Sequence, residues 1–407
     1  MKIGIVSMYG WLRLWDNYGT LLQNYSLQSY LQSLGHETYW IRNRPTSSQK
    51  MPDEYSAGEI LRSPKILVQW LLWVLYGKPK SSKMQKFNRD HPRDFAAFMK
   101  KWVPHTSEEL TIEELFENHP PADAYIVGSD QIWRTVTPLN FLAFGPPQVS
   151  RIAYAVSAPW PALSDEWYSQ AAVEIKRFQA VSVREVEGVD ACARLGYADA
   201  VYAADPTLLL TRDDYLKLVR DDKSDASFPY PVMLGYFVNV RKVSQIPWRA
   251  IKDFAGLKAF ELKVVPLQGT ELIIPDRYVF TPSPAAWINA FDKAECVVTN
   301  SFHGALFAVL MRKPFLVFHQ TSRTASENCR FSSTLGTLGL DNRTVTADEW
   351  QGASASDIKR WMEAEINWED VEARLQAFRQ SSKAFLLDAL EKRGVESEAM
   401  ESTIVKG

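Results

Sequence analysis

Residues 296–318 read CVVTNSFHGALFAVLMRKPFLVF, and this stretch decides the fold class. Its first three residues are apolar and strand-like, and the run stops abruptly at the polar residues 299–301. A helix-like run begins at once, and a second apolar run follows Pro314. A strand, a helix and a strand in direct succession require a crossover connection, which is typical of a parallel sheet covered by helices. His303 stands where the first strand gives way to the helix.

The same alternation extends over most of the chain. Strands are predicted at 2–8, 37–42, 122–130, 151–157, 180–185, 200–210, 232–238 and 262–267, and helices at 19–35, 165–178, 186–195, 246–255 and 283–294. Because helices separate the strands, we expect mostly parallel sheets. The predicted class is therefore α/β, with two Rossmann-like domains that face a central cleft and resemble the GT-B arrangement.

Length and composition suggest how the chain divides. Its 407 residues suit two domains rather than one. The predicted parts are a first domain over 1–210 with a helical insertion at about 56–120, a second domain over 211–365 that carries the histidine, and a closing helix and tail over 366–407. The polar segment 211–231, which ends in prolines, is the predicted linker.

The composition excludes several classes of protein. A formal net charge of −2 gives no global field that would attract nucleic acid. The three cysteines, Cys192, Cys296 and Cys329, are far apart and show neither zinc-ligand spacing nor a disulfide framework. The N-terminal residues are strand-like and lack the features of a secretory signal. We therefore expect a cytoplasmic protein of a reducing compartment, with no metal and no nucleic-acid partner.

One segment leaves two interpretations open. Residues 65–86, KILVQWLLWVLYGKPKSSKMQK, contain an apolar run followed by lysines. The run holds about ten nearly unbroken apolar residues, well short of the roughly 20 that span a bilayer. The pattern predicts either a helix that lies peripherally at the inner face of the membrane or an insertion that packs on its own domain.

Ligands of parallel sheets bind beyond the carboxyl ends of the strands, so the residues just after each predicted strand are the candidates. Asn17, Tyr18 and Gly19 follow the first strand, where a helix N-terminus either binds an anion or simply begins at a capped turn. Ser129 and Asp130 follow a later strand, and no basic partner for Ser129 is evident in the sequence. We expect these five residues to line the cleft or contact an acceptor.

Two further strands end at Arg184 and Asp205. A guanidinium at the carboxyl end of a strand suits bidentate binding of phosphate or carboxylate, and we expect it at the rim of the cleft. The alternative is an ion pair with Glu185 or Glu187. Asp205 precedes Pro206, which is typical of a structural turn, and it is also a candidate for orienting a ligand at the cleft.

His303 is the residue we select for proton transfer. It falls in the first turn of a helix that follows a buried strand, off the predicted apolar stripe of that helix. Gly304 costs roughly 1 kcal/mol against alanine inside a helix, so we expect its small size to give a substrate room. Asn300 or Ser301 is expected to cap the helix.

Eight segments in this order resemble the polysaccharide pyruvyl transferase family. They are DNYGTLLQNYSL, DAYIVGSDQIW, AYAVS, VSVRE, ADPTLLL, SPAAWINAF, CVVTNSFHGALFAVLMRKPF and NCRFSSTLGTLGLDNR, and they extend to about residue 343. The resemblance implies transfer of the pyruvyl group of phosphoenolpyruvate onto a sugar, with formation of a ketal. It places the product in a capsule or other exopolysaccharide of the bacterial cell surface. The acceptor is either the polysaccharide or its lipid-linked precursor, and no cofactor is implied beyond phosphoenolpyruvate as donor substrate.

The resemblance also implies roles for individual residues. It makes Arg184 a donor-binding and catalytic residue, and it makes His303 essential. Many members carry an arginine two residues before that histidine, where this chain has Ser301. Another cation should then balance the phosphate. We predict that this cation is Arg330, and Arg323 is the second candidate. The donor-binding residues predicted on this basis are Arg184, Ser301, Gly304 and Arg330.

Two other functions are compatible with the same sequence. A GT-B glycosyltransferase with a nucleotide-sugar donor would bind UDP or GDP and ignore phosphoenolpyruvate. A carbohydrate-binding protein without catalysis would bind sugar and show no turnover.

Overall fold

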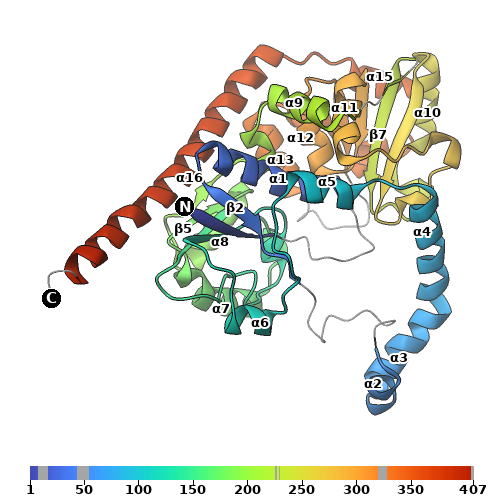
Figure 1. The fold of residues 1–407 in the computed structure, drawn as a ribbon. Helices are drawn as coiled ribbons and strands as arrows, with labels where there is room; N and C mark the ends of the chain where they lie inside the picture. The colour runs from blue at the N-terminus through green and yellow to red at the C-terminus, as the bar shows by residue number, and fades with distance from the viewer. Residues whose placement is uncertain (8–16, 44–54, 225–226, 229, 320–327, 405–407) are drawn as a thin grey trace.

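The computed structural model describes all residues except 8–16, 44–54, 225–226, 229, 320–327 and 405–407. Two parallel sheets dominate it, each in its own half of the molecule (Figure 1). The first sheet has the strand order β2-β1-β3-β4-β5-β6, and the second has the order β11-β10-β9-β7-β8. This arrangement confirms the predicted α/β class with two Rossmann-like domains.

The first sheet is built from continuous apolar runs, because helices and loops cover both of its faces. Its strands are β1 (Lys2–Val6), β2 (Glu37–Trp40), β3 (Ala124–Val127), β4 (Ser150–Val156), β5 (Ala180–Val183) and β6 (Val201–Tyr202). The helices α1 (Tyr18–Ser33), α7 (Asp165–Glu174) and α8 (Val186–Arg194) connect these strands.

The second sheet follows the same rule. Its strands are β7 (Val232–Val238), β8 (Glu261–Leu267), β9 (Cys296–Thr299), β10 (Phe315–Phe318) and β11 (Thr344–Val345). Its helices are α10 (Trp248–Leu257), α11 (Pro284–Lys293), α12 (Phe302–Leu310), α13 (Cys329–Thr337), α14 (Ala347–Trp350) and α15 (Ala355–Met362).

Helix α12, which follows strand β9 in the stretch CVVTNSFHGALFAVL, is buried along its whole length. We predict a single apolar stripe, and the structure shows a wider buried surface. The reason is that α12 packs on its own sheet and also against the turn η6 (Pro206–Leu209) of the first domain. A helix that is covered on all sides needs no polar face, and it carries His303 into the boundary between the domains.

The predicted linker 211–231 connects the two sheets, and most of it is helical. Helix α9 (Arg212–Asp222) begins at Thr211, whose hydroxyl accepts a hydrogen bond from the backbone of Asp214 while that carboxylate accepts one from the backbone of Thr211. Tyr215, Leu218 and Val219 have helical spacing and are buried. The charged residues of this segment lie on the opposite, exposed face, which is why the segment reads as polar in the sequence.

The insertion leaves the first domain and contacts the second. It comprises α2 (Ala57–Arg62), α3 (Pro64–Leu72), a π-helical turn (Trp73–Gly77), α4 (Lys78–Asp90), α5 (Phe95–Trp102) and α6 (Ile112–Glu117). Between α4 and α5, Arg93 Nη2 donates to the carbonyl of Pro266 at 2.8 Å, and the guanidinium lies 3.6 Å from the Glu271 carboxylate. At the end of α5, Trp102 Nε1 donates to Asp222 Oδ1 at 2.8 Å.

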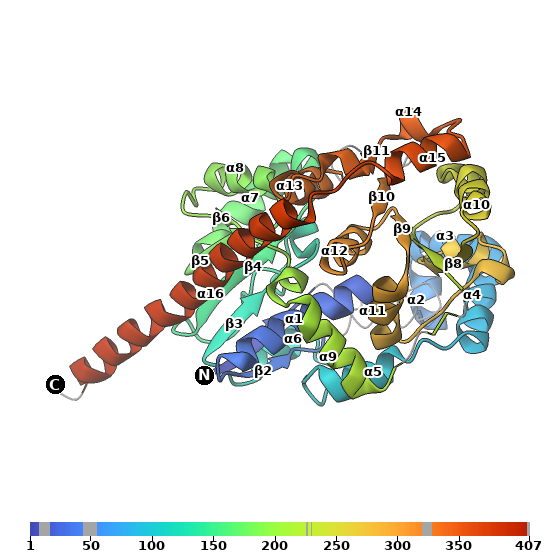
Figure 2. The same cartoon turned by 90° about the horizontal axis from the view of Figure 1, so that it is seen from above.

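The long helix α16 (Trp368–Ile404) crosses in the opposite direction, from the second domain onto the first (Figures 1 and 2). Arg379 Nε donates to the carbonyl of Leu208 at 2.6 Å, and Ser382 Oγ accepts from the backbone of Ala204 at 2.8 Å. Each domain therefore has a segment that packs on the other domain.

The two domains also share one apolar core. Tyr18 of α1 stacks on Trp287 of α11 with ring centroids 5.2 Å apart, and its hydroxyl donates to the carbonyl of Pro282 at 2.6 Å. Tyr18 is completely buried. Tyr18 therefore packs at the domain boundary. The expectation that it lines a cleft is wrong, because its side chain has no exposed surface.

Candidate active site

Four predicted residues from four strand ends meet at the domain boundary. Asp130 follows β3, Arg184 follows β5 and Asp205 follows β6, while His303 lies in the first turn of α12 after β9. Arg184 Nη1 lies 2.9 Å from Asp205 Oδ2, and Arg184 Nη2 lies 3.4 Å from Asp130 Oδ1. His303 Nε2 lies 3.4 Å from the same Asp205 oxygen. The carboxyl ends of both sheets thus supply one polar cluster.

The Arg184 side chain is fully buried among other residues and is not exposed at a cleft. Its Nε lies 3.3 Å from Glu185 Oε1, and its guanidinium carbon lies 4.6 Å from the centre of the Phe302 ring. The expected place at the rim of a cleft is therefore wrong, and the alternative ion pair with Glu185 is present. Three carboxylates surround one guanidinium, which compensates the loss of hydration that burial imposes.

Asp205 has a partner for each oxygen. Oδ1 accepts from the backbone of Thr207 at 3.0 Å and from its hydroxyl at 2.7 Å, while Oδ2 faces Arg184 and His303. Burial alone would raise the pKa of Asp205, but His303 and Arg184 outweigh it and hold that pKa well below its usual range. Asp205 is therefore ionised at neutral pH. Ser129 is buried too, and its hydroxyl donates to the carbonyl of Ala155 at 2.9 Å.

Asp130 is the more accessible carboxylate, with a side chain 16% exposed. Burial would raise the pKa of Asp130, but the charges of Arg184 and His303 outweigh it and lower that pKa. The hydroxyl of Thr20, in the first turn of α1, donates to Asp130 Oδ2 at 2.9 Å. Sequence reasoning missed Thr20, although a hydroxyl next to the predicted anion-binding turn was a readable signal.

The His303 ring packs directly on Gly19 of the other domain. A Cβ atom placed on Gly19 would lie 2.1 Å from His303 Nδ1, so no other residue fits there without a shift. Gly19 lies in the first turn of α1, and Asn17 caps this helix, because its Oδ1 accepts a hydrogen bond from the backbone of Thr20 at 3.3 Å. The first turns of α1 and α12 therefore meet at the imidazole, with Gly19 on one side and Asp205 on the other.

The polar residues before α12 do not cap it with their side chains. Asn300 instead clamps β7, because its Oδ1 accepts from the backbone of Val238 and its Nδ2 donates to the same residue's carbonyl, each at 2.9 Å. Ser301 occupies the N-cap position without a side-chain cap bond. The expectation that Asn300 or Ser301 caps the helix is corrected accordingly, and the first-turn amides of α12 have no side-chain acceptor from these residues.

Gly304 has a packing function. A Cβ atom there would lie 2.4 Å from Thr299 Oγ1 and 2.8 Å from Tyr236 Cδ1, so the glycine lets α12 approach its own sheet. The expected room for a substrate is filled by these two side chains. Tyr236 was missed by the sequence reasoning. Burial raises the pKa of its phenol well above the usual range, and the neighbouring Ser301 hydroxyl offsets part of that rise.

Arg330 lies in the first turn of α13 and is half-buried, with its guanidinium carbon 5.4 Å from the centre of the Phe331 ring. Its charge makes a small contribution to the lowered pKa of Asp130. The other predicted cation, Arg323, lies outside the described residues.

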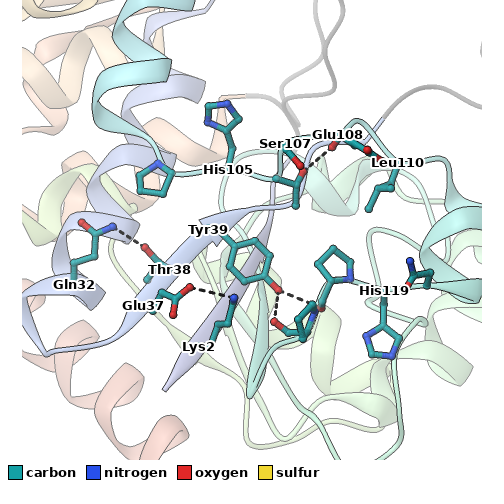
Figure 3. A pocket seen from close by; sticks show the side chains of 15 residues that line it. Lys2, Gln32, Glu37, Thr38, Tyr39, His105, Ser107, Glu108, Leu110 and His119 are labelled. Carbon is teal, nitrogen blue, oxygen red and sulfur yellow. Dashed lines mark hydrogen bonds and ion pairs between the residues drawn. The ribbon is translucent and has the colours of Figure 1, made fainter.

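A separate cavity of about 680 Å³ lies at the opposite end of the first sheet, where Lys2 and Glu37 begin β1 and β2 (Figure 3). His105 and His119 also line it. None of the predicted site residues does. Because ligands of parallel sheets bind at the carboxyl ends of the strands, we place the active site at the His303 cluster and not here.

Across the parts of the chain that the structure describes, no three His, Cys, Asp or Glu side chains are arranged to hold a metal ion. The predicted absence of a metal requirement stays a prediction. Nor does any described helix combine the length and apolar character needed to cross a bilayer.

Two solved structures with a similar arrangement of domains are UDP-GlcNAc 2-epimerases. The UDP-GlcNAc 2-epimerase of Neisseria meningitidis bound to UDP-GlcNAc matches with a TM-score of 0.50 and 12% identity, over 96% of this chain and 100% of that one. The Methanocaldococcus jannaschii UDP-GlcNAc 2-epimerase, solved with UDP-GlcNAc and UDP, matches with a TM-score of 0.51 and 9% identity, over 93% and 99%. At these identities the likeness shows the GT-B-like fold alone.

Sequence comparison identifies the family. No curated protein sequence matched the chain. The sequence model of the polysaccharide pyruvyl transferases matches residues 17–320, which includes Gly19, Asp130, Arg184, Asp205 and His303. A match over most of the chain, together with a cluster built from the segments that carry the resemblance, means that this chain belongs to the polysaccharide pyruvyl transferase family.

Proposed function

We propose that the protein transfers the pyruvyl group of phosphoenolpyruvate onto two hydroxyls of a sugar, as a ketal. The sugar belongs to a cell-surface polysaccharide or its lipid-linked precursor. Membership of the family supports a transferase that acts on polysaccharide. The observation that carries the proposed transfer from phosphoenolpyruvate is His303, held between an ionised Asp205 and Gly19 at the start of α12.

The chemistry needs an acid and a base. A proton is added to the methylene carbon of phosphoenolpyruvate, which leaves an oxocarbenium-like centre at the neighbouring carbon. One sugar hydroxyl forms a C–O bond to that centre and gives up its proton. A second hydroxyl then forms the other C–O bond as the bond to phosphate breaks, and the departing phosphate takes up the proton of this hydroxyl. The products are the ketal and inorganic phosphate, and no oxidant or reductant is needed.

His303 is suited to the first two of these three proton transfers. An imidazole in its protonated form can give a proton to the methylene carbon. The neutral ring that remains can accept a proton from a sugar hydroxyl. Asp205 is then a positioning residue, because it acts through His303. Asp130, which keeps part of its side chain exposed, is our candidate for contact with the acceptor.

The buried position of Arg184 changes the proposed donor site. With its guanidinium shared among three carboxylates, Arg184 holds Asp130 and Asp205 in place and is not itself exposed to phosphoenolpyruvate. We assign the donor's anionic groups to Arg330 and to the first-turn amides of α12, because a helix N-terminus favours anions. Ser301 stands at that N-terminus and lies close to the bound phosphate in this assignment.

Incubation with phosphoenolpyruvate and candidate lipid-linked glycans tests the proposal. We expect a mass gain of one pyruvyl unit on the glycan and release of one phosphate per unit gained. Parallel incubations with UDP-sugars and GDP-sugars address the rival glycosyltransferase function. Sugar transfer from a nucleotide donor without use of phosphoenolpyruvate would overturn the proposal, and so would glycan binding without turnover.

Gly19→Ala should lower the rate of pyruvyl transfer by roughly tenfold to a hundredfold, because the new methyl group displaces the His303 ring from its position. Steady-state turnover measures the effect. Gly256→Ala is the matched control, since that glycine also lies in a helix but a Cβ atom there meets nothing within 4 Å. Equal turnover of both variants would show that the position of His303 is unimportant.

A further inference from the structure

Helices α2 to α4, residues 57–90, form a projection that we call the arm. Figure 1 shows α2 and α3 at the far end of α4, away from both sheets. The base of the arm is anchored, because Met84 and Phe87 of α4 are buried. No residue of α3 is buried. The interpretation of residues 65–86 as an insertion packed on its own domain therefore fails for α3.

The exposed end of the arm is strongly apolar. Nine of the ten residues 66–75 are apolar, and the exception is Gln69. Val68 is 55% exposed, Leu72 is 53% exposed and Leu75 is 64% exposed. A helix that is apolar on all sides is normally covered by protein or by lipid. An exposed surface of this kind marks a site of interaction.

The charge of the arm identifies the chemistry of its partner. Residues 60–89 contain no Asp or Glu, and they contain seven basic residues, Arg62, Lys65, Lys78, Lys80, Lys83, Lys86 and Arg89. The whole chain has a formal net charge of −2, so this basic region contrasts with the rest of the molecule. Apolar residues next to a lysine cluster fit an anionic lipid surface, where each lysine near the headgroups adds to binding.

We propose that the arm binds the surface of an anionic bilayer, with α3 and the following turn lying among the lipid headgroups. The apolar run of ten residues has a helical length of about 15 Å, half of the roughly 30 Å hydrocarbon core, so it lies on the membrane and does not cross it. A second copy of the chain is a poorer partner. A symmetric contact between two arms would bring two sets of seven basic residues together.

Co-sedimentation of the full chain with vesicles tests the proposal without reference to enzymatic activity. We expect binding to vesicles of phosphatidylcholine with phosphatidylglycerol, and about tenfold weaker binding to phosphatidylcholine alone. Leu72→Asp with Leu75→Asp should weaken binding to the anionic vesicles by about tenfold or more. Both side chains are more than half exposed, so the variant should unfold at the same temperature as the wild type.

The matched control is Val173→Asp with Leu257→Asp, which makes the same charge change at side chains 64% and 61% exposed outside the arm. It should bind vesicles nearly as well as the wild type. Absence of wild-type binding to anionic vesicles would overturn the proposal, as would equal losses in the two variants. Sedimentation of the protein without lipid tests whether the arm binds a second copy of the chain. A wild-type dimer that is lost in the Leu72→Asp, Leu75→Asp variant would identify a second copy as the partner and overturn the proposal.

Discussion

A His303→Gln variant is expected to lose about 10²–10⁴-fold in the rate of pyruvyl transfer, the usual contribution of a positioned acid or base. Glutamine is close to histidine in size and can still approach Asp205, but it cannot give and take a proton. The fold should be retained, because the polar contact of the ring with a described residue is a single pair, at 3.4 Å to Asp205 Oδ2, and the ring is otherwise buried. Single-turnover release of phosphate measures the chemical step directly.

His105→Gln is the control for that experiment. His105 lines the cavity at the opposite end of the first sheet (Figure 3). Its Nδ1 lies 2.6 Å from the carbonyl of Val103. We expect its turnover to remain close to that of the wild type. A result in which His105→Gln is slow and His303→Gln is normal would move the active site to that cavity and refute the assignment made here.

Arg184→Met should lower the free energy of unfolding by about 3–5 kcal/mol, because it leaves Asp130, Glu185 and Asp205 without their shared cation in a buried site. Unfolding in urea at neutral pH measures the change. Arg177→Met is the matched control. Arg177 is partly exposed and pairs with Glu174 at 2.7 Å, and such surface pairs contribute about 0–1 kcal/mol.

The same variant separates two roles for Arg184. If the guanidinium contacts the donor directly, Arg184→Met would raise KM for phosphoenolpyruvate and leave the free energy of unfolding nearly unchanged. If it organises the carboxylates, stability falls first, and the remaining activity falls through kcat as His303 and Asp205 lose their alignment. The buried ion pairs favour the second outcome.

The fold was predictable because it depends on local patterns. Apolar runs such as residues 180–183 or 296–299 alternate with helix-like segments, and that alternation restricts the chain to parallel sheets with crossovers. The meeting of Asp130, Arg184 and His303 was predictable for a related reason. Parallel strands bring their carboxyl ends to one edge, so residues just after the strands gather there.

The directions of individual side chains were not predictable in this way. Arg184 turns inward because Asp130 and Asp205 join the adjacent Glu185 around it. The pair with Glu185 was one of the alternatives that the sequence offered, but the pairs with Asp130 and Asp205 span long stretches of chain and leave no local signal. Gly304 lets α12 pack closely against Tyr236, which lies on strand β7. Tyr18 stacks on Trp287 across the domain boundary, and a residue buried between domains looks in the sequence like one that faces a ligand.

The two crossings between the domains have a consequence for the chain as a whole. Arg93 of the insertion is bonded to the second domain, while Arg379 and Ser382 of α16 are bonded to the first. If the chain were cut near residue 210, each half would lose a segment that belongs to the other half of the chain and packs on its surface. The halves are interdependent in folding, so heat or denaturant should melt them in one cooperative transition, and neither can be expected to persist as an autonomous fragment.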